Sequence, residues 1–206
     1  MRFTGWIIVL IVAAIGGITF YSLSPGSGDE GYELRLLEER KEKDKYMKTS
    51  PDSPFAEDPD SFEGLKYFAP DRSYSVRARL VPIQDKKVRT IATNSGQETH
   101  YLEYAWAEFE FNDASFKLLL LEVMDMGPER GKLFVAFADK TSAVDTYGAG
   151  RYLDLKKQPG AGTLILDFNK AYNPYCAYVD GYSCPLPVKE NILDVTIHAG
   201  EKNYHD

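Results

Sequence analysis

Cysteine and histidine are scarce in this chain of 206 residues, and basic residues are fewer than acidic ones. It contains 2 cysteines and 3 histidines, and 24 basic residues face 31 acidic ones, so the formal net charge is −7. Two cysteines are too few for a small scaffold held together by disulfides. The negative charge argues against nucleic acid as a partner, because binding to phosphates depends on basic side chains. Aromatic residues, in contrast, reach 13%, which favours β-structure.

The N-terminus carries a long apolar run. No charged residue occurs from Trp6 to Tyr21, and the run approaches the roughly 20 residues that span the hydrocarbon core of a bilayer. A cleaved signal peptide is the alternative, but bulky aromatics at the end of the run disfavour cleavage. We therefore predict a transmembrane signal-anchor over residues 1–24. Because Arg2 is the only charge before it, we expect a single pass through the inner (cytoplasmic) membrane, with the folded domain outside the cytoplasm.

A flexible linker and a charged helix are predicted next. Residues 25–31 are rich in glycine and contain Pro25, which is typical of a flexible spacer. Residues 32–48 mix acidic and basic side chains and are predicted to form a surface helix that rests one edge on the domain. A coiled-coil stalk is the alternative, but no heptad pattern lasts for three repeats. The narrow apolar stripe of this helix would comprise Leu34, Leu37 and Tyr46, with Leu36 and Met47 as further candidates.

Residues 32–206 are predicted to form a single β-rich domain. Short apolar and alternating segments follow one another with turns between them, and no later segment has the length and period of a crossover helix. This leaves an antiparallel sandwich or barrel of about eight strands. Phe116–Val123 is apolar enough to be a central strand buried on both faces. The predicted strands cover residues 74–82, 88–93, 101–111, 116–123, 133–137, 151–155, 163–168 and 192–197.

The candidates for chemistry lie in the C-terminal third. Arg151 follows a glycine-containing segment at residues 147–150, which suits either a β-bulge or a loop that presents backbone N–H groups and the arginine to an anion. Asp154 and Asp167 lie on adjacent predicted strands, and Asp139 ends a third. These acids could bind a divalent cation or act as general acid and base, or they could cap turns and pair with the arginine.

An ordered loop over residues 169–178, with a turn at Asn173-Pro174, supplies further polar side chains. The candidate ligand-binding residues are Tyr147, Arg151, Asp154, Asp167, Asn169 and Asn173.

Cys176 and Cys184 are eight positions apart. In an oxidising compartment a disulfide between them would stabilise the fold by roughly 2–3 kcal/mol. Two buried free thiols are the main alternative, and a nucleophile or metal ligand is a weaker one. Neither these cysteines nor the histidines match a zinc pattern, so no metal site is predicted and no cofactor can be named.

Several motifs of this region occur in a fixed order. They read FADKTS (137–142), TYGAGRYLD (146–154), LDFNKAYNPYCAY (166–178), SCPLP (183–187) and AGEK (199–202). The series resembles the bacterial family called domain of unknown function 1684, in a short membrane-anchored form, over roughly residues 32–202. This resemblance implies a bacterial protein with a β-rich domain, and it implies no activity, cofactor or catalytic residue.

Three classes of function are compatible with the sequence. The first is a binding module for a small polar or anionic ligand or for a partner protein. The second is a hydrolase-like enzyme that uses Asp139, Asp154 and Asp167, with or without a divalent metal. The third is a structural component of a cell-envelope complex. The membrane is the expected partner of the N-terminal helix, and nucleic acid is not expected.

Overall fold

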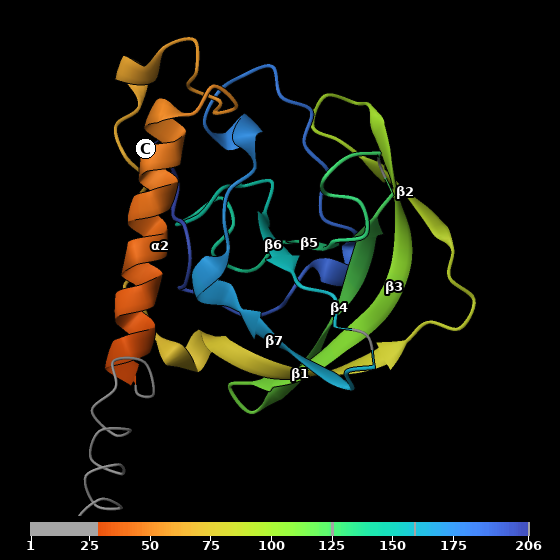
Figure 1. The fold of residues 1–206 in the computed structure, drawn as a ribbon. Helices are drawn as coiled ribbons and strands as arrows, with labels where there is room; N and C mark the ends of the chain where they lie inside the picture. Colours follow the sequence, from red (N-terminus) through yellow and green to blue (C-terminus); the bar gives the residue numbers. More distant parts are fainter. Residues whose placement is uncertain (1–28, 125, 159, 206) are drawn as a thin grey trace, which may run out of the picture.

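The computed structural model describes residues 29–124, 126–158 and 160–205, and Figure 1 shows how they are arranged. Within these residues, helix α2 (Asp29–Thr49) is followed by seven strands and five short 3-10 helices. The strands are β1 (Ser75–Pro82), β2 (Val88–Ala92), β3 (Glu98–Phe111), β4 (Ala114–Val123), β5 (Leu133–Phe137), β6 (Arg151–Leu155) and β7 (Thr163–Asp167). The 3-10 helices are η1 (Pro59–Ser61), η2 (Arg72–Tyr74), η3 (Phe168–Lys170), η4 (Tyr175–Ala177) and η5 (Lys189–Asn191).

The strands of the described part form one antiparallel sheet that curls into a half-barrel (Figure 1). The sheet order is β6-β5-β4-β3-β1-β7, and β2 pairs with the first half of β3. Strand β3, with 14 residues, pairs with β4 on one side and with β2 and β1 on the other. A register shift between Glu103 and Ala105 indicates a β-bulge, which bends the strand and increases its twist. The mainly β, antiparallel prediction is confirmed, but a single curled sheet replaces the predicted sandwich or closed barrel.

Strand β4 runs through the middle of the hydrophobic core. Leu118–Leu121 are each at most 1% exposed. The even-numbered leucines belong to the apolar cluster that contains Phe137, and the odd-numbered ones to the cluster that contains Phe134. Successive side chains of a strand point to opposite faces, so β4 is covered on both sides. The prediction of a doubly buried strand is therefore confirmed.

Asn191 is inserted between β4 and β5. The two strands pair directly only through Leu121↔Phe134 and Glu122↔Leu133. Beyond this point the Asn191 Oδ1 accepts from Leu119 N at 2.7 Å, and its Nδ2 donates to Leu119 O at 3.1 Å and to Ala136 O at 3.0 Å. The side chain is fully buried. It therefore takes over ladder hydrogen bonds that the diverging strands no longer make to each other.

The prediction of an eighth strand at residues 192–197 is wrong. Only Ile192 forms a β-bridge, an isolated one with Ala138. The Ile197 carbonyl instead accepts from the Arg151 guanidinium at 3.0 Å, and the Ile197 amide donates to Asp139 Oδ1 at 3.4 Å. Asn191, Leu193 and Val195 make backbone hydrogen bonds to Ala138 and Lys140, but at Ile197 the backbone binds side chains instead, so the pairing does not continue into a strand. Ile197 is nevertheless fully buried, and this burial explains why the segment has the apolar pattern of a strand.

Helix α2 rests on the domain with a partly charged face. It begins at Asp29, so residues 29–31, predicted as linker, form its first turn. Leu36 and Met47 are buried, as are most of Arg40 and much of Lys43 between them. The other members of the predicted stripe, Leu34, Leu37 and Tyr46, are 64%, 37% and 40% exposed. The prediction of a surface helix is confirmed, but only Leu36 and Met47 of the predicted apolar stripe lie on its contact face.

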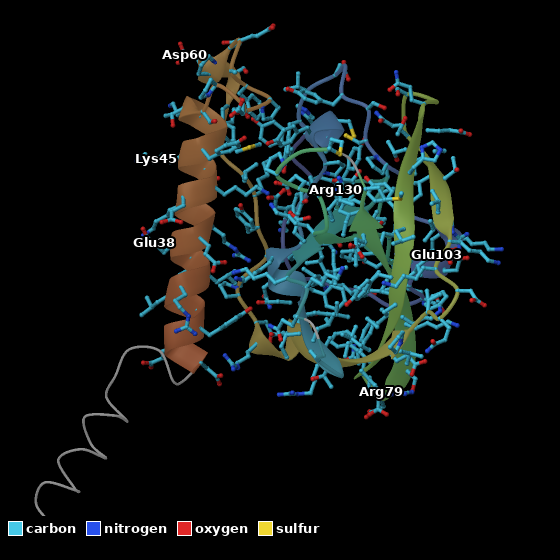
Figure 2. All side chains as sticks on the ribbon, turned by 45° about the vertical axis from the view of Figure 1, so that its right-hand side comes forward. Glu38, Lys45, Asp60, Arg79, Glu103 and Arg130 are labelled. Atoms are coloured by element: carbon cyan, nitrogen blue, oxygen red, sulfur yellow. The ribbon has the colours of Figure 1, made fainter. Side chains whose placement is uncertain are left out.

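The opposite face of α2 is solvated. Figure 2 shows Glu38 and Lys45 pointing away from the sheet. The predicted transmembrane segment, residues 1–24, lies outside the described residues, as does the start of the predicted linker. Within the described ranges, no helix has both the length and the hydropathy needed to cross a membrane.

Candidate functional site

Arg151, the predicted anion clamp, lies in the interior and is 1% exposed. Its Nη2 donates to Asp139 Oδ2 at 2.8 Å and to Ile197 O at 3.0 Å, and its Nη1 donates to the carbonyls of Ala199 and Glu201. Burial lowers the pKa of Arg151, while the carboxylate of Asp139 opposes this shift. Both terminal nitrogens are thus bound within the protein, and Arg151 holds the C-terminal segment in place.

Gly150, directly before Arg151, is a packing position. Its φ of +91° is in the left-handed region, and a Cβ added here would lie 2.5 Å from Phe137 O and 2.7 Å from Pro187 Cγ. Glycine is therefore required by close approach of the backbone. This close packing gives the glycine a structural reason that needs no ligand.

The three candidate aspartates do not form one site. Asp139 pairs with the buried arginine. Asp154 is exposed on β6 and accepts from the Tyr172 hydroxyl at 3.0 Å. Asp167 accepts from the Tyr32 hydroxyl of α2 at 2.8 and 3.0 Å. No group of three or more His, Cys, Asp or Glu among the described residues is placed to hold a metal ion. These carboxylates position loops and the helix.

Asn169 and Asn173 bind backbone and are each 1% exposed. The Asn169 Oδ1 accepts from Asp71 N at 2.9 Å, and its Nδ2 donates to Asp71 O at 2.7 Å. The Asn173 Nδ2 donates to Lys202 O at 2.8 Å. Both side chains thereby join segments that are distant in the sequence.

Glu201 is a buried polar residue that the sequence analysis did not single out. It is 1% exposed, and its carboxylate collects four donors. Oε1 accepts from Lys43 Nζ at 2.7 Å and from the Tyr67 hydroxyl at 3.5 Å, and Oε2 accepts from Asn173 N at 2.9 Å and from the Tyr178 hydroxyl. Burial, followed by the charge of Glu201, raises the pKa of both tyrosines, so they remain protonated donors.

Gly200 allows the Glu201 segment to reach this position. Its φ is +77°, and an added Cβ would lie 2.5 Å from Ala171 O and 2.8 Å from Phe168 O. The Glu201 amide then donates to Ala171 O at 2.9 Å. The AGEK motif was therefore a visible signal, but only the fold shows which cation and which tyrosines meet its carboxylate.

Arg40 of α2 lies beside this cluster with 9% of its surface exposed. Its Nη1 donates to Phe68 O at 2.8 Å, and its Nη2 donates to Asn169 O at 3.4 Å. The guanidinium carbon lies 4.4 Å from the centre of the Tyr67 ring, a distance that suits a cation–π contact. The buried Nε finds no acceptor among the described residues. Burial lowers the pKa of Arg40, but the guanidinium stays charged at neutral pH.

A cavity of about 100 Å³ lies between α2 and the C-terminal segments of the domain. Its walls include Leu36, Arg40, Lys43, Tyr67, Tyr172 and Glu201. Lys170 and Glu39, which also line it, are half-exposed and form an ion pair at 2.6 Å. The remaining lining charges are Arg40 and Lys43 against Glu201. The cavity wall therefore carries one positive charge in excess, and it offers N–H donors rather than a free carboxylate.

The cysteines lie elsewhere. Both are free thiols in the structure, so the predicted disulfide is not formed there. Tyr147 donates its hydroxyl proton to Cys176 Sγ at 3.7 Å, and it is not part of the cavity wall. Of the predicted ligand-binding residues, only Asn169 lines the cavity.

Comparison with known proteins places the chain in a family. The family model described as "Protein of unknown function (DUF1684)" matches residues 60–202. The chain belongs to this family. Among solved structures, it is similar to the solution NMR structure of the uncharacterized protein from gene locus rrnAC0354 of Haloarcula marismortui, with 35% identity and a TM-score of 0.64. That match covers 84% of this chain and 95% of the other. No curated protein matches.

The residues that line the cavity lie partly inside and partly outside the DUF1684 match. It begins at residue 60 rather than near residue 32 as predicted, so it contains Tyr67, Tyr172 and Glu201. Arg40 and Lys43, which supply the excess positive charge, lie on α2 outside the matched residues.

Proposed function

We propose that this protein is a binding module for a small monoanion, most suitably a short-chain monocarboxylate, held between α2 and the β domain. The observation that carries the proposal is the pair of cations, Arg40 and Lys43, in the wall of the cavity, where the single carboxylate of Glu201 opposes them. A carboxylate bound there would be held by charge-assisted hydrogen bonds from these cations.

The charge of the site favours a single negative charge. Both oxygens of Glu201 are already bound by Lys43, tyrosines and a backbone amide, so this carboxylate stays in place as a fixed negative charge. One ligand charge balances the excess of the cavity wall, whereas a dianion would meet uncompensated repulsion from Glu201. The second donor is Lys43, whose Nζ binds Glu201 with one of its three protons.

The size and lining favour a short carboxylate over a bare inorganic anion. The cavity of about 100 Å³ has room for several water molecules or for a ligand of a few heavy atoms. Leu36 and the rings of Tyr67 and Tyr172 provide apolar surface next to the cations. A carboxylate with one or two carbons attached uses both kinds of surface.

The decisive experiment is a thermal-shift and calorimetric titration of the full chain with formate, acetate, propionate, chloride and sulfate at constant ionic strength. A ligand present at 100 times its Kd stabilises the fold by about 2.7 kcal/mol, which corresponds to a rise in Tm of about 5–11 °C for a domain of this size. We expect acetate or propionate to act at lower concentration than chloride or sulfate.

Matched variants test the residues. Arg40→Met and Lys43→Met should abolish the shift, because each removes a cation of the cavity wall. Lys41→Met is the control, because this lysine is 75% exposed and pairs with Glu38 on the solvated side of the helix. Unchanged acetate binding in folded Arg40→Met protein, or no response of the native protein to any monoanion, would refute the proposal.

We also propose that residues 1–24 anchor the chain in the inner membrane with this domain outside the cytoplasm. The uncharged run from Trp6 to Tyr21 and the charge at Arg2 support this orientation. Alkaline extraction should leave the chain with the membranes, and protease added to cells with a permeabilised outer envelope should digest the domain. Recovery in the soluble fraction, or complete protection from protease, would contradict it.

A further inference from the structure

Cys176 and Cys184 lie against each other in the folded chain. The backbone amide of Cys176 donates to Cys184 Sγ at 3.3 Å. Cys184 is 7% exposed, whereas Cys176 is partly accessible to solvent. Tyr147 completes the cluster by donating its hydroxyl proton to Cys176 Sγ at 3.7 Å. The two thiols are therefore neighbours in space as well as in the sequence, and one of them can be reached from outside.

Each cysteine is held by a different part of the fold. Cys184 N donates to Asn94 Oδ1 at 2.7 Å, and Asn94 N donates to Cys184 O at 3.1 Å, which attaches Cys184 to the turn after β2. Cys176 lies in η4, and the Ala177 and Tyr178 amides next to it donate to Pro174 O and Tyr175 O. The fold thus holds both cysteines in place beside each other, and this is what a pair of thiols needs in order to form a disulfide.

We propose that Cys176 and Cys184 form a reversible dithiol–disulfide pair that is oxidised by a low-molecular-weight disulfide such as glutathione disulfide. This inference uses no residue of the anion cavity and is independent of the proposed function.

The reaction runs in two exchanges. The Cys176 thiolate attacks one sulfur of the oxidant, the oxidant's S–S bond breaks, and one glutathione thiolate leaves, so that Cys176 carries a mixed disulfide. Cys184 then loses its proton to solvent and attacks Cys176 Sγ, which expels the second glutathione thiolate. In total the protein loses two protons and two electrons, and the oxidant becomes two thiols.

The surroundings assign the order of attack. Cys176 is accessible, and the Tyr147 hydroxyl donates a hydrogen bond to its sulfur. Burial raises the pKa of Cys184 to about 12, so it is a poor first nucleophile. Once the mixed disulfide is formed on Cys176, the second attack is intramolecular, because Cys184 already lies beside Cys176. Cys176 is therefore the attacking thiol and Cys184 the resolving thiol.

The test uses the full chain equilibrated overnight in glutathione buffers of increasing oxidised fraction, then acid-quenched, alkylated and mapped by mass spectrometry. The native chain is expected to show a Cys176–Cys184 disulfide that dithiothreitol reverses. Cys184→Ser should stop at glutathionylated Cys176, and Cys176→Ser should show little modification at Cys184. The accumulation of the mixed disulfide in Cys184→Ser alone distinguishes an attacking and resolving pair from two unrelated thiols.

Two further results decide the assignment. Thiols that stay reduced in the most oxidising buffer, or a native chain that stops at the mixed disulfide, would overturn the proposal. Tyr147→Phe should slow alkylation of Cys176 by iodoacetamide several-fold at fixed pH without changing the fold. An unchanged rate would remove Tyr147 from the mechanism.

Discussion

Replacing Asp139 by alanine tests whether Arg151 is a structural residue. The side chains of Asp139 and Arg151 are 0% and 1% exposed, and they form an ion pair at 2.8 Å. Asp139 Oδ1 also accepts from the Thr141 amide at 2.7 Å and from its hydroxyl at 2.6 Å. Asp139→Ala therefore leaves a buried guanidinium without its carboxylate and a turn without its cap.

The expected loss is large because the partner charge stays behind. Removing one member of a buried ion pair costs about 3–5 kcal/mol, a substantial share of the roughly 5–15 kcal/mol that stabilise a typical domain. For a domain of this size each kcal/mol shifts Tm by about 2–4 °C, so Tm should fall by about 6–20 °C. The double variant Asp139→Leu, Arg151→Met should recover much of the loss, because it removes both charges and restores apolar volume.

Urea denaturation followed by circular dichroism measures the change in the free energy of unfolding. The matched control is Asp194→Ala, which breaks an exposed pair with Lys140 at 2.7 Å, where the Asp194 side chain is 90% exposed. Exposed pairs contribute little, so the control should change stability by less than about 1 kcal/mol. If Asp139→Ala proves as mild as the control, or if it weakens acetate binding while stability is retained, the structural assignment of Arg151 is wrong.

Two other substitutions probe positions where backbone and side chain meet closely. Asn191→Ala should lower the free energy of unfolding by about 2–4 kcal/mol in the same urea assay, because it leaves buried backbone groups of β4 and β5 without partners. A loss under about 1 kcal/mol would show that the two strands pair with each other when the asparagine side chain is missing. Gly200→Ala should destabilise far more than Gly96→Ala, since both glycines have a φ near +78° but only at Gly200 would the Cβ collide with backbone, at 2.5 Å from Ala171 O. Equal Tm values for the two glycine variants would contradict this packing argument.

The sheet was predictable because its signals are local. Alternation and short turns define strands within a few residues, and the run Leu118–Leu121 shows burial on both faces directly. The number of strands was overestimated by one, because residues 192–197 have the periodicity of a strand, yet they form only an isolated bridge at Ile192 and the Ile197 backbone binds side chains. Curvature into a half-barrel depends on pairings between distant segments, and no local pattern reports it.

The candidate site was less predictable because its charges come from opposite ends of the chain. Arg151 was a reasonable anion clamp from its glycine-rich context, but a deeply buried arginine and an accessible one look the same in a sequence. Arg40 and Lys43 could not be distinguished in the sequence from the many other charged residues of α2, because the face of the helix that contacts the domain was expected to be apolar. Glu201 stood in a motif, yet its partner Lys43 is 158 positions away.

The charged contact face of α2 determines how the protein can be divided for study. Cutting the chain at residue 60, where the family match begins, would discard Lys43 and Arg40 together with Leu36 and Met47. Glu201 would keep its tyrosines but lose its cation, and an apolar surface that the helix covers would face water. Such a fragment would be expected to aggregate or to bind proteins nonspecifically, and a negative ligand screen on it would say nothing about the intact chain. A fragment made for binding studies should therefore start no later than Asp29, because the helix is a wall of the domain rather than a spacer.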